Sequence, residues 1–134
     1  MLEVAGIDHI VLRTAHLSEM LHFYSQVLGC QIERQTPTDV GLTQLRAGSA
    51  LIDLVAVDSM LGKLGGGSPG DKGNNVDHFC LQLKSATEVE IRDHLSAYGV
   101  EIGEFSERYG AHGLGQSVYV RDPDGNTVEL RSQL

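Results

Sequence analysis

The chain has 134 residues, a length that suits one ordinary domain or two small, similar half-domains. Hydrophobic residues make up 41% of it and charged residues 21%, a globular composition that excludes a largely disordered chain. The 18 Asp and Glu residues outnumber the 10 Lys and Arg residues and give a formal net charge of −8; no basic cluster appears, so we exclude a nucleic-acid-binding protein.

The first half of the chain predicts one strand, one helix and three further strands. Residues 6–13 (GIDHIVLR) are rich in β-branched and apolar side chains, as strands are. Apolar residues then recur at steps of three and four from Leu17 to Leu28, which indicates a helix, and Gly29 ends that pattern. Shorter strands are predicted at 31–35, 40–46 and 50–57.

A glycine-rich stretch at 59–75 separates this half from a second half with the same order of elements. Six glycines and one proline fall between Gly62 and Asn75, a composition that predicts a flexible connection. A strand is then predicted at 76–83, a helix at 86–98, strands at 101–106, 116–121 and 126–131, and a tight turn at 122–125 (DPDG).

The chain therefore predicts two βαβββ modules, at 1–58 and 76–134, joined by the connection at 59–75. Matching landmarks support an internal repeat: IDH at 7–9 matches VDH at 76–78, and IDL at 52–54 matches VEL at 128–130. We predict an α+β fold in which the helix of each module packs on one face of its strands.

Two histidines and two carboxylates recur at matching places on the predicted strands. Because side chains alternate between the faces of a strand, Glu129 lies on the face opposite its apolar neighbours, and the same alternation favours a shared cleft for His9, His78 and Asp53. This donor set suits a divalent metal. Two histidines and one carboxylate suit non-haem Fe(II), and a second carboxylate suits a Lewis-acid site. The alternative, histidines that only fill structural positions, stays open here.

Five segments carry a resemblance that covers nearly the whole chain: DHIVLRT, HFYSQVLGC, ALIDLVAV, VDHFCLQL and DPDGNTVELR. Together they resemble the vicinal oxygen chelate superfamily, which includes glyoxalase I, extradiol dioxygenases and bleomycin-resistance proteins. The resemblance implies a curved, barrel-like mixed sheet around a metal cleft. It also implies metal ligands on the first and last strand of each module, which correspond to His9, Asp53, His78 and Glu129. Asp53 stands where glyoxalase I has glutamate.

The same resemblance suggests residues that touch the substrate. Glyoxalase I carries an arginine four residues after its first ligand, which holds the glutathione carboxylate, and Arg13 has that spacing. His112, in the predicted glycine-bearing loop YGAHGLG, is a second candidate contact because such loops often cover a cleft. Asp8 and Asp77 precede the two histidines and alternate to the opposite face, so we expect them to hydrogen-bond loop backbone.

The resemblance implies a divalent-metal-dependent enzyme of the glyoxalase type, a lyase, an isomerase or a thiol transferase, with Ni, Zn, Co, Mn or Fe and a thiol cosubstrate such as glutathione. Glu129 or Asp53 would act as the catalytic base. Two alternatives remain: an Fe(II) extradiol-type dioxygenase that uses His9, His78 and Glu129, and a metal-free small-molecule-binding protein of the resistance type. Many relatives dimerise, so we expect a homodimer.

The two cysteines and the first residues of the sequence indicate the cellular compartment that we expect. Cys30 and Cys80 are two lone cysteines far apart in the sequence, which favours a reduced compartment over a disulfide framework. No apolar run reaches the length of a membrane helix, and the first residues show no basic region followed by an apolar stretch. We therefore expect a cytoplasmic protein.

Overall fold

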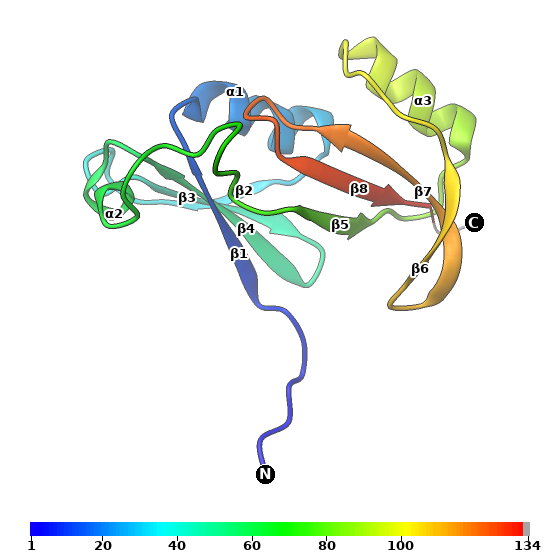
Figure 1. Cartoon of the computed structure of the whole chain (residues 1–134), viewed down its shortest axis with the longest axis horizontal. Coiled ribbons are helices and arrows are strands. Elements are labelled where there is room, and N and C mark those ends of the chain that lie inside the picture. The colour runs from blue at the N-terminus through cyan, green and yellow to red at the C-terminus, as the bar shows by residue number, and fades with distance from the viewer. Residues whose placement is uncertain (133–134) are drawn as a thin grey trace. The chain divides into compact units, whose positions relative to one another are not determined.

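The computed structural model describes residues 1–132 and divides the chain into two compact units. Unit 1 is Met1–Pro69 and unit 2 is Gly70–Leu134, so the division falls inside the predicted glycine-rich connection. Figure 1 shows both units with their α-helices and strands labelled, and each unit is described by itself below. Within the described residues, no helix is long and apolar enough to cross a membrane.

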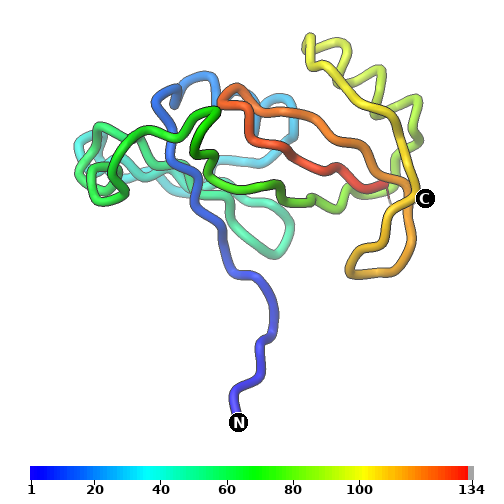
Figure 2. Tube along the Cα trace, in the orientation of Figure 1, coloured from blue at the N-terminus to red at the C-terminus, as the bar shows by residue number. Residues whose placement is uncertain are grey.

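Unit 1 is a four-stranded mixed sheet with a helical segment packed on it. Its strands follow the order β1-β4-β3-β2; β1 and β4 run parallel and the other pairs antiparallel. Residues 1–7 lead away from this sheet as an extended tail (Figure 2). The elements are β1 (His9–Thr14), α1 (Leu17–His22), η1 (Phe23–Val27), β2 (Ile32–Gln35), β3 (Leu42–Ala47), β4 (Ala50–Ala56) and α2 (Met60–Lys63).

The core of unit 1 lies on one face of this sheet, as alternation predicts. On β1, Leu12 is fully buried, whereas Val11 is 47% exposed. Met20 and Tyr24, from the helical segment, are fully buried. The opposite face of β1, which carries His9, is therefore not part of this core and is available for a polar site.

Unit 2 repeats the topology of unit 1. Its strands follow the order β5-β8-β7-β6, with β5 and β8 parallel and the other pairs antiparallel. Thr87 caps α3 in a capping box with Glu90. The elements are β5 (His78–Gln82), α3 (Glu88–Ala97), β6 (Ser106–Gly110), β7 (Gly113–Arg121) and β8 (Thr127–Arg131). The predicted α+β fold of two βαβββ modules is confirmed.

Three local expectations need correction. The helix predicted over 17–28 changes after His22 into the wider turns of a π-helix, η1, where the hydroxyl of Ser25 donates to the carbonyl of Leu21. The connection at 59–75 contains a short helix, α2, capped by the Ser59 side chain. The strand predicted at 101–106 lies instead at Ser106–Gly110, and the residues expected to form a loop around 109–115 belong to the β6–β7 hairpin, with Gly110 opposite Gly113.

The turn between β7 and β8 is confirmed and is held by one carboxylate. Asp122 is buried, and its Oδ1 accepts hydrogen bonds from the backbone nitrogens of Asp124 and Asn126. Its Oδ2 accepts from the side-chain amide of Asn126. These bonds fix the entry into β8 and thereby the register that carries Glu129.

Candidate functional site

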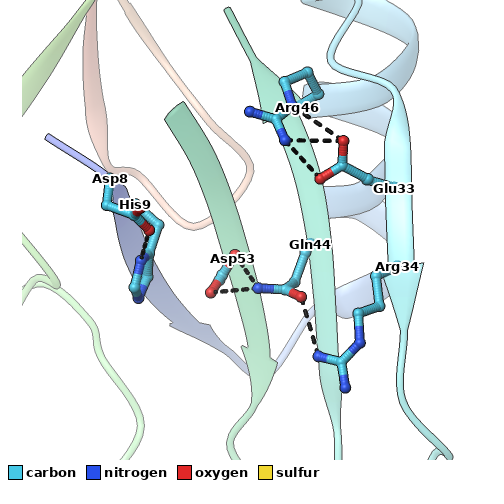
Figure 3. Close-up of polar contacts among 7 residues, drawn as sticks. All are labelled: Asp8, His9, Glu33, Arg34, Gln44, Arg46 and Asp53. Carbon is cyan, nitrogen blue, oxygen red and sulfur yellow. Dashed lines mark hydrogen bonds and ion pairs between the residues drawn. The ribbon is translucent and has the colours of Figure 1, made fainter. Parts of the chain in front are cut away.

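In unit 1, His9 and Asp53 lie on the same face of two adjacent parallel strands (Figure 3). His9 pairs with Leu51, and Asp53 comes two residues later on β4, so the two side chains are diagonal neighbours on that face. Asp53 attracts the protonated form of His9. The hydrogen bond with Asp8 and then this attraction raise the pKa of His9 above its ordinary value.

A row of polar side chains extends from Asp53 across the sheet. The Gln44 amide nitrogen, on β3, donates to both carboxylate oxygens of Asp53 at 3.2 Å. The amide oxygen of Gln44 accepts a hydrogen bond from Arg34, on β2, at 3.1 Å (Figure 3). Asp53 is only 4% exposed, and Gln44 thus compensates for part of the loss of water around it.

Unit 2 places His78 and Glu129 in the same register. His78 pairs with Thr127, and Glu129 comes two residues later on β8, as Asp53 does on β4. Nε2 of His78 lies 3.9 Å from Oε1 of Glu129. The histidine and the carboxylate thus have the same register in both sheets, as the repeat in the sequence predicts.

Glu129 is buried among donors. Burial acts to raise its pKa, but hydrogen bonds from Cys80, Ser117, Tyr119 and Arg131 outweigh burial and hold the pKa below its ordinary value. Among these donors, Cys80 Sγ lies 3.2 Å from Oε2 of Glu129. Glu129 is therefore an anion near neutral pH, available to a cation or to a proton.

The same contact changes the chemistry of the cysteine. Cys80 is exposed as a residue, but partial removal of water around its sulfur, and then the hydrogen bond and negative charge of Glu129, raise the pKa of the thiol to about 12. Near neutral pH the thiol stays protonated and acts as a donor to Glu129. Cys80 therefore acts as a hydrogen-bond donor to the Glu129 carboxylate and not as a nucleophile.

The Arg131 side chain lies beside Glu129, and two glycines leave space for its guanidinium. Its guanidinium donates to the backbone oxygens of Arg108 and Gly113. A Cβ added at Gly110 would lie 2.8 Å from the guanidinium carbon, and one at Gly115 would lie 2.9 Å from a terminal nitrogen. The glycines at 110 and 115, which predicted a loop, are therefore required by a buried arginine inside a hairpin.

Tyr119 and Arg108 complete the face of unit 2 beside His78. The Tyr119 ring meets the His78 ring edge-on, with centroids 5.6 Å apart. The Arg108 guanidinium lies over the Tyr119 ring, 4.4 Å from its centroid, and donates to the backbone oxygen of Ser117. Sequence reasoning missed both residues. The pairing of β7 with β8, which sets Tyr119 opposite Glu129, is the signal that leads to Tyr119.

The expectation for Asp8 and Asp77 is wrong. Asp8 Oδ1 lies 2.6 Å from Nδ1 of His9, and Asp77 Oδ2 lies 2.7 Å from Nδ1 of His78. Each aspartate stands just before the first residue of its strand, where strand alternation does not yet apply. The signal that pointed to these pairs was the repeated Asp-His dipeptide itself.

The two residues predicted to touch the substrate take different positions. Arg13 donates to the backbone oxygens of Gly62, Gly66 and Gly67 and so clasps the glycine-rich segment. His112 is exposed in the two-residue turn of the β6–β7 hairpin.

The donor chemistry of each histidine–carboxylate pair fits a divalent metal. Zn²⁺ binds imidazole nitrogen and carboxylate oxygen at about 2.0–2.2 Å, which places two ligands of one ion about 3–3.5 Å apart. The 3.9 Å between His78 Nε2 and Glu129 Oε1 needs only a small side-chain rotation. Within residues 1–132, however, no group of three His, Cys, Asp or Glu side chains is arranged to hold an ion.

The chain was compared with known proteins. It is 26% identical over 129 residues to a catechol-2,3-dioxygenase of Bacillus subtilis, which covers 96% of this chain and 41% of that protein. It is 30% identical over 126 residues to the virulence protein STM3117 of Salmonella typhimurium, covering 92% of this chain and 81% of that protein. The chain thus spans about two fifths of the length of the dioxygenase.

Among solved structures, an integron cassette protein from the mobile metagenome of V. cholerae aligns with a TM-score of 0.75 and 27% identity, covering 100% of this chain and 99% of that one. The family model for the glyoxalase/bleomycin resistance protein/dioxygenase superfamily matches residues 6–130. The paired βαβββ units and this match together show that the chain belongs to that superfamily, whose members include enzymes and small-molecule-binding proteins.

Proposed function

We propose that this chain is a divalent-metal-dependent enzyme of the glyoxalase type, a lyase, an isomerase or a thiol transferase, acting on a small substrate through two vicinal oxygens. The observation that carries the proposal is the repeated pair, His9 with Asp53 and His78 with Glu129, set in one register in both units. A histidine that only fills a structural position does not need a carboxylate at the same diagonal, so the recurrence favours a shared role as ligands.

The proposed ligands are the four residues of these two pairs. A divalent ion held there supplies Lewis-acid polarisation of the substrate oxygens. Each histidine presents Nε2, since its Nδ1 faces an aspartate. Glu129, kept ionised by its donors, is the proposed proton acceptor, and Asp53 is the second candidate for that role.

Substrate contacts are proposed for Arg13 and His112. Arg13 is the cation for an anionic substrate group, such as the carboxylate of a glutathione conjugate. Its guanidinium already serves three backbone oxygens, so a substrate anion would take over some of those hydrogen bonds. His112 is exposed in the turn of the β6–β7 hairpin, where a ligand can reach it.

The test is elemental analysis of untagged protein purified without chelators, beside His9→Ala, His78→Ala and Glu129→Ala. We expect near-stoichiometric Ni, Zn, Co or Mn in the wild type and its loss in all three variants. His94→Ala, which removes an exposed histidine from α3, is the matched control and should keep the metal. A wild type that takes up no metal even after reloading contradicts the proposal and favours a metal-free binding protein.

The second candidate is an Fe(II) extradiol-type dioxygenase that uses His9, His78 and Glu129. The similarity to a catechol-2,3-dioxygenase favours it, as does Gln44, which occupies both oxygens of Asp53 and suits a site with one carboxylate ligand. Protein loaded with Fe(II) without air, then given a catechol and O₂, should consume O₂ with no added thiol. Retention of iron rather than the other metals, together with that uptake, would replace the first proposal.

A further inference from the structure

We infer that Asp8 and Asp77 are positioning residues that fix the tautomer and the orientation of His9 and His78, so that each imidazole presents Nε2 to the metal. The inference rests on the proposed function, because it names what prepares the ligands proposed above. It adds two residues that lie outside the four proposed ligands.

The first step is the geometry of the two hydrogen bonds. The Asp8–His9 and Asp77–His78 separations are 2.6 Å and 2.7 Å, as short as charge-assisted N–H···O bonds or slightly shorter, and both involve Nδ1. A carboxylate accepts only, so Nδ1 must carry the proton. The neutral imidazole then has its lone pair on Nε2, the form that binds a metal.

The second step is the direction in which Nε2 points. In unit 2, the Nε2 of His78 is the atom that lies 3.9 Å from Glu129. The same ring therefore has its protonated nitrogen on an aspartate and its free lone pair beside the proposed second ligand. Metal-bound histidines commonly donate their other ring nitrogen to a carboxylate, which raises their basicity.

The third step is that stability does not explain these contacts. The Asp8 and Asp77 side chains are 91% and 97% exposed, and exposed ion pairs contribute little to folding. The bond nevertheless recurs in both units at the residue before the strand. A contact that stabilises little, yet is repeated beside both histidines, fits positioning of a ligand better than support of the fold.

The chain offers a matched control in a third Asp-His dipeptide, Asp93-His94. It lies within α3, where neighbouring side chains point about 100° apart around the helix. Asp93→Asn changes the net charge and the dipeptide just as Asp77→Asn does, but at a distance from the β5–β8 face.

The first measurement needs no metal. Nitrogen-15 NMR of the metal-free protein above pH 8 assigns the tautomer of each imidazole. We expect Nδ1–H for His9 and His78 in the wild type. Asp77→Ala should move His78 toward Nε2–H, whereas Asp77→Asn, whose amide oxygen still accepts, should retain Nδ1–H. Asp8→Ala should act on His9 alone, and Asp93→Asn on neither.

The second measurement is the dissociation constant for Co²⁺ or Zn²⁺, from competition with a chromogenic chelator. We expect Asp77→Ala and Asp8→Ala to weaken binding about 10–100-fold, with Asp77→Asn between them and the wild type. Asp93→Asn should change it less than about 2-fold, the size expected of a distant charge. The melting temperature should stay nearly constant throughout, which separates positioning from a loss of fold.

Two results overturn the inference by different routes. If the wild type binds metal and His78→Ala abolishes binding, but the aspartate variants keep the tautomer and the affinity, the positioning role is wrong and the proposed function stands. If the wild type binds no metal at all, the proposed function fails, and the aspartates have no ligand to position whatever the tautomer.

Discussion

Arg131 and Glu129 lie side by side in the interior of unit 2: a guanidinium nitrogen of Arg131 is 3.6 Å from Oε2 of Glu129, and both side chains are 8% exposed. The two side chains carry buried charges of opposite sign. Each also makes further hydrogen bonds, and together these contacts stabilise this part of β8. Loss of one partner leaves the other charged and without compensation.

We therefore expect Arg131→Met to lower the free energy of unfolding by about 3–5 kcal/mol, measured by urea denaturation. Arg46→Met is the matched control, since Arg46 pairs with Glu33 at 2.8 Å but both side chains are over 40% exposed. Its effect should stay within about 1 kcal/mol. Equal effects of the two substitutions would show that Arg131 contributes no more than a surface ion pair.

The close approach of Gly115 to Arg131 gives a second prediction. Gly115→Ala places a methyl group 2.9 Å from a guanidinium nitrogen and should destabilise the protein by about 1–3 kcal/mol. Gly73→Ala, with nothing within 4 Å of the added Cβ, is the control. The Gly115→Ala cost should shrink once Arg131→Met has removed the obstacle. Strict additivity in the double variant contradicts the contact.

The contact of Gly115 with Arg131 illustrates why some parts of the fold could be predicted from the sequence and others could not. Period-2 and period-3.6 patterns located most strands and both main helices because these elements bury one face. Gly110 and Gly115 misled the prediction, since glycine favours loops by conformational freedom alone. Here glycine is required by a side chain that reaches the hairpin from β8, a tertiary contact that no local pattern records.

The main residues of the candidate site could be predicted from the sequence, but the residues that surround them could not. Strand alternation and the repeat placed His9 with Asp53 and His78 with Glu129, and the register of each sheet agrees. Asp8 was misplaced because alternation was extended one residue beyond the start of β1. Partners of the carboxylates such as Gln44 come from other strands, so finding them requires the strand order as well as the sequence.

A third prediction concerns the Cys80 thiol, whose pKa of about 12 leaves almost no thiolate at pH 8.5. In metal-free protein, alkylation of Cys80 by iodoacetamide should be far slower than in the urea-unfolded chain. Glu129→Gln removes one cause of the raised pKa while burial, the larger cause, remains, so the rate should rise several-fold without reaching the unfolded value. Peptide mass spectrometry separates Cys80 from Cys30. A native rate equal to the unfolded rate contradicts this assignment.

A fourth prediction follows from the lowered pKa of Glu129. A carboxylate whose folded pKa lies below its unfolded value of 4.5 stabilises the folded state above that value and ceases to do so as pH falls through the folded pKa. In metal-free protein, the advantage of wild type over Glu129→Gln should therefore be constant near neutral pH and decline below pH 4.5. Urea denaturation from pH 7 to pH 3 measures it. An advantage that grows on acidification would reverse the sign and refute the assignment.

The last prediction concerns the clasp that Arg13 forms on the glycine-rich segment, where its guanidinium donates to the backbone oxygens of Gly62, Gly66 and Gly67. Arg13→Met should speed backbone hydrogen exchange in residues 62–67, measured by mass spectrometry, because three hydrogen bonds to that segment disappear. Arg46→Met should leave the segment unchanged. If Arg13 also binds a substrate anion, saturating glutathione conjugate should speed exchange in the wild type, since the anion takes over donors that hold the segment. Unchanged exchange with the conjugate bound would restrict Arg13 to the clasp, and unchanged exchange in Arg13→Met would remove the clasp itself.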